Sequence, residues 1–224
     1  MCNHYRKDQK VIEWSVRRIP RVRIPVAMGP LHEHTYPKYP APVLVEEAGE
    51  RTLVAIRWGV WPFYAKAKPQ FLTNARNDGL LTKPTWRQSA AKRRCLIPAT
   101  GYYEPGTGPV GSKGELLFVV KDRARFFLAG LWDRDPDDSG TRAFTMVTTE
   151  PNDYVRPFHD RMPVVLGDDE AEAWLGDEPL PDAELMRLCR GLPSEALHHE
   201  TLAPKLKITR PSKKEGPDEG SMLF

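Results

Sequence analysis

The stretch Cys95–Pro105, CLIPATGYYEP, combines a predicted strand, a turn and a lone carboxylate. The strand Arg94–Ile97 leads into the turn at Gly101, and Glu104 follows two tyrosines. A carboxyl group in apolar surroundings has a raised pKa and can act as a general acid or base. A strand-end glutamate that faces water has neither property, and the sequence leaves both interpretations open.

Five more strands are predicted on either side of this stretch, because the segments are short, rich in β-branched and aromatic residues and bounded by turn residues. They are Val43–Val45, Thr52–Trp58, Leu116–Val120, Phe126–Leu131 and Ala143–Thr148, and a glycine-rich hairpin is predicted over Gly106–Gly114. Helices are predicted from Pro84 through Ala91, over Asp168–Leu175 and over Asp182–Cys189. With 22 prolines in 224 residues, the pattern indicates a single α+β domain dominated by short antiparallel strands.

The composition, 40% hydrophobic and 28% charged, allows a substantial core. No apolar stretch reaches the length of a membrane span and no signal peptide is recognisable, so we expect a cytoplasmic protein. Three widely spaced cysteines argue against a disulfide framework. Basic residues crowd Arg17–Arg23 and Lys92–Arg94, which indicates either a face that attracts a polyanion or an ordinary solvated surface.

Cys2 stands where a structural thiol is unusual, because a chain terminus frays. Removal of Met1 would give one residue both an α-amine, with a pKa of about 8, and a thiol. Such a 1,2-aminothiol condenses with an aldehyde, first to an imine and then to a five-membered thiazolidine. The alternative is a small residue packed into a strand.

Two further segments carry candidate polar groups. TNAR, Thr73–Arg76, sets an asparagine that can orient a polar ligand near an arginine that can hold a phosphate. In PFHDRMPVVL, Pro157–Leu166, His159 is a candidate proton shuttle. A turn asparagine and a structural histidine are the alternatives. The histidines of His32–His34 and His198–His199 lack a further ligand at recognisable spacing, so neither a metal site nor a cofactor is predicted.

Taken together and in order, these segments resemble the SOS response-associated peptidase (SRAP) family. The matching pieces are Met1-Cys2, KYPAP, IRWGVWP, TNAR, RRCLIPATGYYE, LAGLW and TTEPNDYVRPFHDRMPVVL. The resemblance implies one α+β domain, residues 1–209, with a curved, mainly antiparallel, barrel-like sheet and a few peripheral helices. The polar segment 210–224 is expected to be a flexible tail.

The resemblance also implies a function, the covalent capture of abasic sites in single-stranded DNA after autocatalytic removal of Met1. We expect a monomer that associates with the nucleoid when it is bound to DNA. The implied roles are Cys2 as nucleophile, Asn74 positioning its amine or the new ring, Glu104 assisting proton transfer and His159 assisting the opening of the sugar ring. In the same way, Arg76 and Arg161 would hold phosphates, and Pro42, Trp61 and Thr148 would shape the wall that faces DNA.

The sequence departs from the family pattern at several positions. Asn3-His4 replaces the usual Gly-Arg, and Pro105 replaces a tryptophan. Asn77–Gly79 replaces an acid-containing run, and Tyr64 stands where a second tryptophan is common. None of these changes removes a proposed reacting group.

Two other functions fit the same residues. One is a cysteine peptidase in which Cys2 attacks an amide and His159 is its base. The other is a non-covalent nucleic-acid-binding module that uses only the basic stretches.

Overall fold

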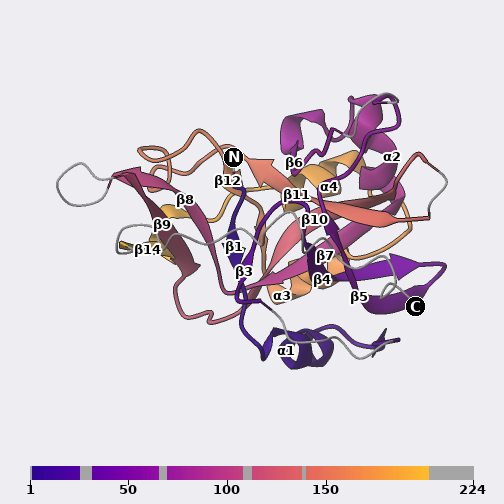
Figure 1. Cartoon of the computed structure of the whole chain (residues 1–224), viewed down its shortest axis with the longest axis horizontal. Helices are drawn as coiled ribbons and strands as arrows, with labels where there is room; N and C mark the ends of the chain where they lie inside the picture. The colour runs from indigo at the N-terminus through magenta and orange to yellow at the C-terminus, as the bar shows by residue number, and fades with distance from the viewer. Residues whose placement is uncertain (1, 26–31, 66–69, 108–112, 138–139, 202–224) are drawn as a thin grey trace, which may run out of the picture.

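Two β-sheets make up the body of the protein (Figure 1). The computed structural model describes residues 2–25, 32–65, 70–107, 113–137 and 140–201. Within these residues the chain is a single α+β domain, as the sequence predicts.

The larger sheet has the strand order β12-β11-β10-β7-β4-β5-β2. Because β5 also pairs with β11, five of its strands close into a ring, which confirms the barrel-like core. The strands of the ring are β4 (Pro40–Glu47), β5 (Glu50–Trp58), β7 (Arg94–Ala99), β10 (Phe126–Arg134) and β11 (Arg142–Thr149). The short strands attached to it are β2 (Val22–Arg23), β6 (Asn74–Arg76), β12 (Met162–Pro163) and β13 (Val165–Leu166).

The smaller sheet has the order β14-β9-β8-β1-β3. Its strands are β1 (Tyr5–Arg6), β3 (His34–Thr35), β8 (Gly101–Thr107), β9 (Lys113–Val120) and β14 (Leu197–Thr201). Gly106 pairs with Gly114 across β8 and β9, as the predicted hairpin requires, while the tip of that hairpin and the expected tail, 210–224, lie outside the described residues.

The chain passes from the ring to the smaller sheet between β7 and β8. A side chain at Gly101 would place its Cβ 2.9 Å from the carbonyl oxygen of Phe118 and 2.6 Å from Leu117, so only glycine allows this approach to β9. From there Tyr102 pairs with Tyr5 on one side and with Phe118 on the other. The stretch that begins at Cys95 therefore joins the two sheets.

All six predicted strands are present, and each is longer in the structure than predicted. The predicted helices are present as α2 (Pro84–Lys92), α3 (Asp168–Trp174) and α4 (Asp182–Leu188). Helix α1 (Val11–Arg18) was not predicted, because its charged residues hide an amphipathic pattern that buries Val11 and Ser15. Strand β8 was not predicted either, because a turn was expected at Gly101, where the structure has the first residue of the strand. The two- to five-residue strands were also missed, since so short a segment carries no clear alternation.

Two apolar clusters form the core. The first is shared by the ring and the smaller sheet and includes Cys2, Tyr5, Tyr102, Phe118 and Trp132. The second lies against the helices and includes Leu96, Trp174 and Leu185. Cys95 and Cys189 are buried thiols. Among the described helices, none is long and apolar enough to cross a membrane.

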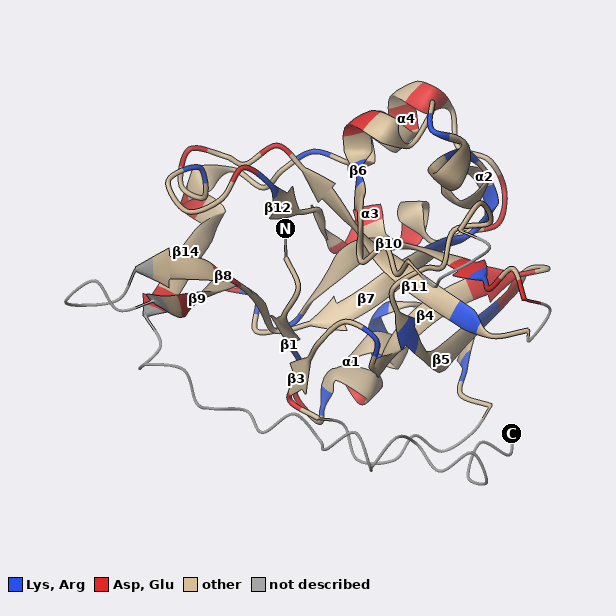
Figure 2. Cartoon of the chain, turned by 45° about the horizontal axis from the view of Figure 1, so that its top comes forward, with Lys and Arg blue, Asp and Glu red and all other residues tan. Residues whose placement is uncertain are grey.

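The basic stretches do not form a free positive face. Arg17 pairs with Glu13, Arg18 with Asp168, Arg23 with Glu50 and Arg93 with Asp133. Figure 2 shows acidic and basic residues interspersed along the strands of the ring. The charge pattern by itself therefore favours the solvated surface over a polyanion-binding face.

Arg94 provides a test of what holds the helices to the ring. Its guanidinium is buried and donates hydrogen bonds of 2.6–3.0 Å to the carbonyl oxygens of Ala90, Ala91, Trp174 and Glu178. We predict that Arg94→Met lowers the free energy of unfolding by about 3–5 kcal/mol, because four carbonyl groups, two of them in the buried residues Ala90 and Trp174, lose their donor.

The matched control is Arg18→Met, whose side chain is exposed and whose ion pair lies at the surface. Its effect should stay within about 1 kcal/mol. Chemical denaturation of both variants measures the difference, and equal losses would contradict the structural role of Arg94.

Candidate functional site

The N-terminal segment enters the core immediately before β1. Cys2 is 1% exposed and lies in the first apolar cluster with Tyr5 and Tyr102. Its thiol donates to the carbonyl oxygen of His4, with Sγ and the oxygen 3.4 Å apart. Burial raises the pKa of this thiol far above its usual value, and the nearby carboxylate of Glu104 raises it further. In this environment the sulfur is a protonated thiol rather than a thiolate.

Asn74 holds the backbone of Cys2 directly. Strand β6 runs parallel to β11 with Asn74 opposite Met146, which fixes the position of its side chain. The amide Nδ2 donates to the carbonyl oxygen of Cys2 at 2.9 Å and to Thr73 Oγ1 at 3.0 Å. The amide Oδ1 is buried and has no hydrogen-bond partner among the described residues. It is therefore an acceptor available to a donor near Cys2.

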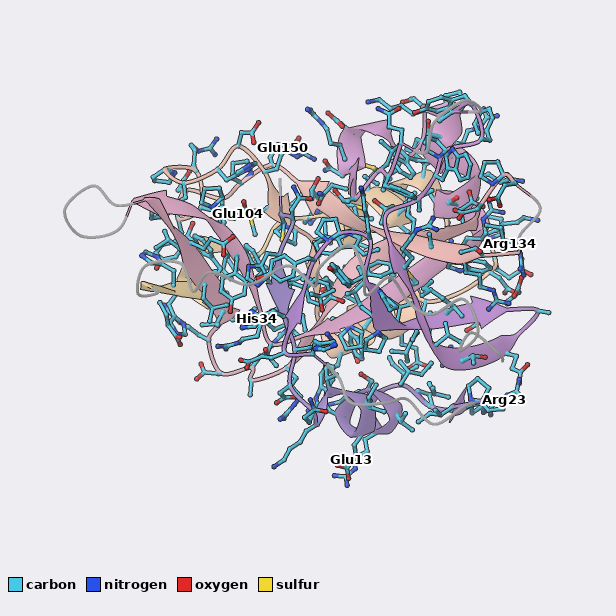
Figure 3. The ribbon with its side chains drawn as sticks, in the orientation of Figure 1. Glu13, Arg23, His34, Glu104, Arg134 and Glu150 are labelled. Atoms are coloured by element: carbon cyan, nitrogen blue, oxygen red, sulfur yellow. The ribbon has the colours of Figure 1, made fainter. Side chains whose placement is uncertain are left out.

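Glu104 is a buried carboxyl group on the inner face of β8. Side chains two apart on a strand share a face, so Glu104 points to the same side as Tyr102. Figure 3 shows it beside the segment that leads into β1. Its side chain is 1% exposed, and neither oxygen has a hydrogen-bond partner within the described part of the chain. Burial raises the pKa of Glu104 to about 7, so both protonation states are populated near neutral pH.

His159 faces Glu104 from the turn that precedes β12. Its Nε2 lies 3.9 Å from Glu104 Oε2, and its Nδ1 accepts a hydrogen bond from the backbone N–H of Arg161 at 3.0 Å. Nδ1 also lies 2.9 Å from Asp160, whose side chain is 85% exposed and free to turn into water, so the fixed backbone donor decides the tautomer. The ring proton of the neutral form therefore sits on Nε2, toward Glu104. Burial lowers the pKa of His159.

The two arginines differ in their surroundings. Arg76 is half exposed and forms a bidentate ion pair with Asp78, in which Nη2 and Oδ2 are 2.6 Å apart.

Arg161 is buried and donates to Asn77 Oδ1 and to the carbonyl oxygen of Thr148, while its Nη1 pairs with Glu150 at 2.7 Å. A hollow of about 360 Å³ opens beside this network, lined by residues that include Asn77, Glu150 and Arg190.

The remaining three predicted residues lie on separate elements. Pro42 is buried in β4. Thr148 is buried in β11, opposite Arg76 of β6. Trp61 is half buried, and its indole N–H donates to the carbonyl oxygen of Ala65. The structure thus brings four of the predicted residues together: Asn74 is bonded to Cys2, His159 lies 3.9 Å from Glu104, and Glu104 acts electrostatically on Cys2. Thr148 and the two arginines lie close by on β6, β11 and the turn before β12.

No role is predicted from the sequence for three residues that support the site, Asn3, Thr73 and Asn77. Thr73 accepts from Asn74, and its own hydroxyl donates to Asn3 Oδ1 at 2.8 Å. Asn77 accepts from Arg161. A side chain that acts only as a hydrogen-bond partner has no sequence signal of its own, so these residues could be found only in the structure. No group of three or more histidine, cysteine or acidic side chains within the described residues could hold a metal ion.

Sequence comparisons relate the chain to a known family. The sequence model of the family described as SOS response associated peptidase (SRAP) matches residues 1–207. Similar proteins include the abasic site processing protein YoaM of Bacillus subtilis, 32% identical over 136 residues, and the abasic site processing protein HMCES of Gallus gallus, 28% identical over 179 residues. These alignments cover 59% and 68% of this chain but 60% and 53% of the two relatives, so the chain matches little more than half of their length.

Solved structures are similar over nearly the whole chain. A protein from Bacteroides thetaiotaomicron has a TM-score of 0.76 at 26% identity, with 90% of this chain and 92% of that chain covered. A protein from Bordetella bronchiseptica has a TM-score of 0.71 at 26% identity, with 90% and 100% covered.

The buried carboxyl group predicts an unusual dependence of stability on pH. The pKa of Glu104 is about 7 in the folded chain and 4.5 as the ordinary value, so between these values the folded state binds more protons than the unfolded state. The free energy of unfolding should therefore decrease as the pH rises from about 4.5 to about 7. Glu104→Gln removes this decrease, and the variant should exceed the wild type by about 1–3 kcal/mol near pH 8.

Glu13→Gln is the matched control, because Glu13 is 64% exposed. Denaturation curves of the three proteins at pH 5 and pH 8 measure the difference. The same pH dependence in Glu104→Gln and the wild type would show that the carboxyl group is not held in its neutral form.

Proposed function

The chain belongs to the SOS response-associated peptidase (SRAP) family, and on that premise we propose that it captures abasic sites in single-stranded DNA through a thiazolidine ring on Cys2. One observation carries the proposal. Cys2, which would hold an amine and a thiol side by side, is fixed by Asn74. It lies near the carboxyl group of Glu104, whose pKa is about 7. The substrate class is taken from the similar proteins, which are described as abasic site processing proteins.

The reaction begins with removal of Met1, which frees the α-amine of Cys2. An abasic deoxyribose is in equilibrium with a ring-opened aldehyde. The amine adds to the aldehyde carbon, and loss of one water gives an imine. The sulfur then adds to the same carbon as its proton leaves, and the imine nitrogen takes up a proton. The product is a five-membered ring whose carbon bears both the nitrogen and the sulfur of Cys2.

Asn74 supports this reaction by orienting the reacting amine. Its Nδ2 is already committed to the Cys2 carbonyl oxygen, while its Oδ1 has no hydrogen-bond partner among the described residues. An amine on the same residue is a donor of the right kind for that oxygen. Holding the amine in one orientation lowers the entropic cost of reaching the reactive geometry.

Glu104 and His159 share the proton transfers. The Cys2 thiol is protonated in its buried position, so its addition to the imine requires a base. Glu104 is suited to accept that proton, because its oxygens have no other hydrogen-bond partner in the described chain and its pKa is about 7. Neutral His159 directs its Nε2 toward Glu104 and can assist the opening of the sugar ring.

The DNA would be held by the residues around this centre. Arg76 is half exposed and can exchange Asp78 for a phosphate. Arg161 would have to release Glu150, whose side chain is 63% exposed, to do the same. Pro42, Trp61 and Thr148 are the proposed wall residues, and single-stranded DNA is the proposed partner of the monomer.

A cysteine peptidase that acts on other proteins is the weaker candidate. Its nucleophile must be a thiolate, whereas burial and Glu104 both raise the pKa of the Cys2 thiol. We assign the peptidase activity of the family name to the removal of Met1 alone. Capture by reversible charge contacts is also weaker, because most of the residues in the basic stretches are paired with acids.

Cys2 provides the direct test. Wild-type protein mixed with a single-stranded oligonucleotide that contains one abasic site should give a shifted band on a denaturing gel. Cys2→Ala should abolish that band, whereas Cys189→Ala, which alters another buried thiol, should leave it unchanged. A band of undiminished intensity with Cys2→Ala would exclude the thiazolidine.

The α-amine can be tested separately from the thiol. We predict that the intact mass of the purified protein lacks one methionine residue. Acetylation of the N-terminus should abolish the crosslink even when the thiol still reacts with a thiol reagent after unfolding. Retention of Met1 in a protein that crosslinks would contradict the proposed chemistry.

A further inference from the structure

His4 is held from four directions. Its Nδ1 lies 3.1 Å from Glu115 Oε2, and its Nε2 lies 2.9 Å from His34 Nδ1. Its ring is stacked between Tyr103, with centroids 3.8 Å apart and planes at 15°, and Tyr36, at 4.3 Å and 22°. The residue is 5% exposed, so both its faces and both its nitrogens are engaged.

The contacts of His4 come from three parts of the smaller sheet. His34 and Tyr36 belong to β3 and the residue next to it, Tyr103 to β8 and Glu115 to β9. Tyr103 and Glu104 are adjacent on β8, so their side chains point to opposite faces, and His4 is packed on the face away from Glu104. Figure 3 shows His34 well below Glu104 in that view.

The hydrogen bonds of the two histidines are mutually consistent. An ionised Glu115 is an acceptor only, so His4 Nδ1 carries the proton that it donates. A neutral His4 then has a lone pair on Nε2, which accepts from Nδ1–H of His34. Both nitrogens of His4 and Nδ1 of His34 therefore have matching partners when both histidines are neutral.

The main chain of His4 connects these contacts to Cys2. The carbonyl oxygen of His4 accepts from the Cys2 thiol at 3.4 Å and from the backbone N–H of Tyr103 at 2.9 Å. Asn3, between them, has an exposed side chain whose Oδ1 accepts from Thr73 Oγ1 at 2.8 Å and lies 3.4 Å from Asn74 Nδ2. The residues on either side of the Asn3–His4 peptide are thus attached to two different sheets, Asn3 to the larger one and His4 to the smaller one.

We propose that Asn3 and His4 form a clamp that positions Cys2 for its reaction, with Asn3 tied to β6 and the His4 side chain locked into the smaller sheet. The proposal rests on the proposed function of Cys2. It assigns a role to the two residues that depart from the Gly-Arg pattern of the family.

The clamp is needed because a chain terminus ordinarily frays. Once Met1 is removed, Cys2 is the terminal residue and has a peptide bond on one side only. Productive ring closure requires its amine and thiol to stay beside Asn74 and Glu104. Fixing the next two residues removes the backbone freedom that would carry Cys2 away, which raises the rate of reaction at a given affinity for DNA.

His4→Phe is the principal test, since phenylalanine keeps the stacking and loses both ring hydrogen bonds. With saturating abasic oligonucleotide, the crosslinking rate should fall about tenfold, while the Kd for an intact oligonucleotide of the same sequence should change less than about twofold. Amide hydrogen exchange of residues 3–5 and of Tyr103 should become faster, while that of the ring strands should stay the same. His4→Gln, whose amide can donate to Glu115 and accept from His34, should recover most of the rate.

His198→Phe is the matched control, because His198 is an exposed histidine in the same sheet. It should leave the rate, the Kd and the exchange unchanged. Asn3→Ala tests the other half of the clamp at an exposed side chain and should slow crosslinking about threefold. This variant also decides the matter if His4→Phe fails to fold.

Several results would overturn the clamp. One is a wild-type crosslinking rate and wild-type amide exchange in both His4→Phe and Asn3→Ala. Another is a variant that binds the oligonucleotide more weakly but crosslinks at the wild-type rate when the oligonucleotide is saturating. The third is faster amide exchange spread over the whole domain. If the wild type itself forms no crosslink, the proposed function fails, and the exchange measurements still decide whether His4 holds the N-terminal segment.

Discussion

The close approach of Gly101 to β9 is the constraint on which the rest of the structure depends. It lets the chain leave the ring at Ala99 and start β8 in the smaller sheet with only Thr100 between the two strands. The alternation of β8 then turns Glu104 inward and Tyr103 outward. The inner face receives the Cys2 thiol and His159, and the outer face receives the ring of His4. One strand therefore presents the proposed proton-transfer group on one side and the proposed anchor of the N-terminus on the other.

The site is maintained at some expense of stability. Neither the carboxyl group of Glu104 nor the amide oxygen of Asn74 has a hydrogen-bond partner in the described chain. Burying polar groups without partners in a core is unfavourable. The surrounding structure offsets this through groups that are fully bonded, such as the Arg94 guanidinium and the Trp174 indole, which donates to the carbonyl oxygens of Cys95 and Gly130. Polar groups left without partners beside a reactive residue are typical of sites that form their bonds only with a substrate.

Charge contributes less to this site than the count of arginines suggests. Most of the basic residues in the two crowded stretches pair with acids, and Arg94 is buried among carbonyl oxygens. Long-range attraction of DNA by these stretches is therefore weak. Recognition would depend on a small number of groups near Cys2, in particular Arg76 and Arg161, whose present acidic partners are partly exposed and can be exchanged for phosphate.

The sequence by itself determined the strand and helix pattern of the ring, since those segments are long enough to show their periodicity, and it determined which residue types could carry chemistry. It also made Cys2 a candidate nucleophile, because the pairing of an amine with a thiol that removal of Met1 would give depends only on covalent order. The tertiary structure alone decided what surrounds each group. The pKa of Glu104 depends on burial by residues from other strands, and the tie between Asn74 and Cys2 joins residues 72 positions apart. Asn3 and His4 likewise have no sequence signal for their partners, because hydrogen bonds and stacking between distant segments exist only once the sheets have formed.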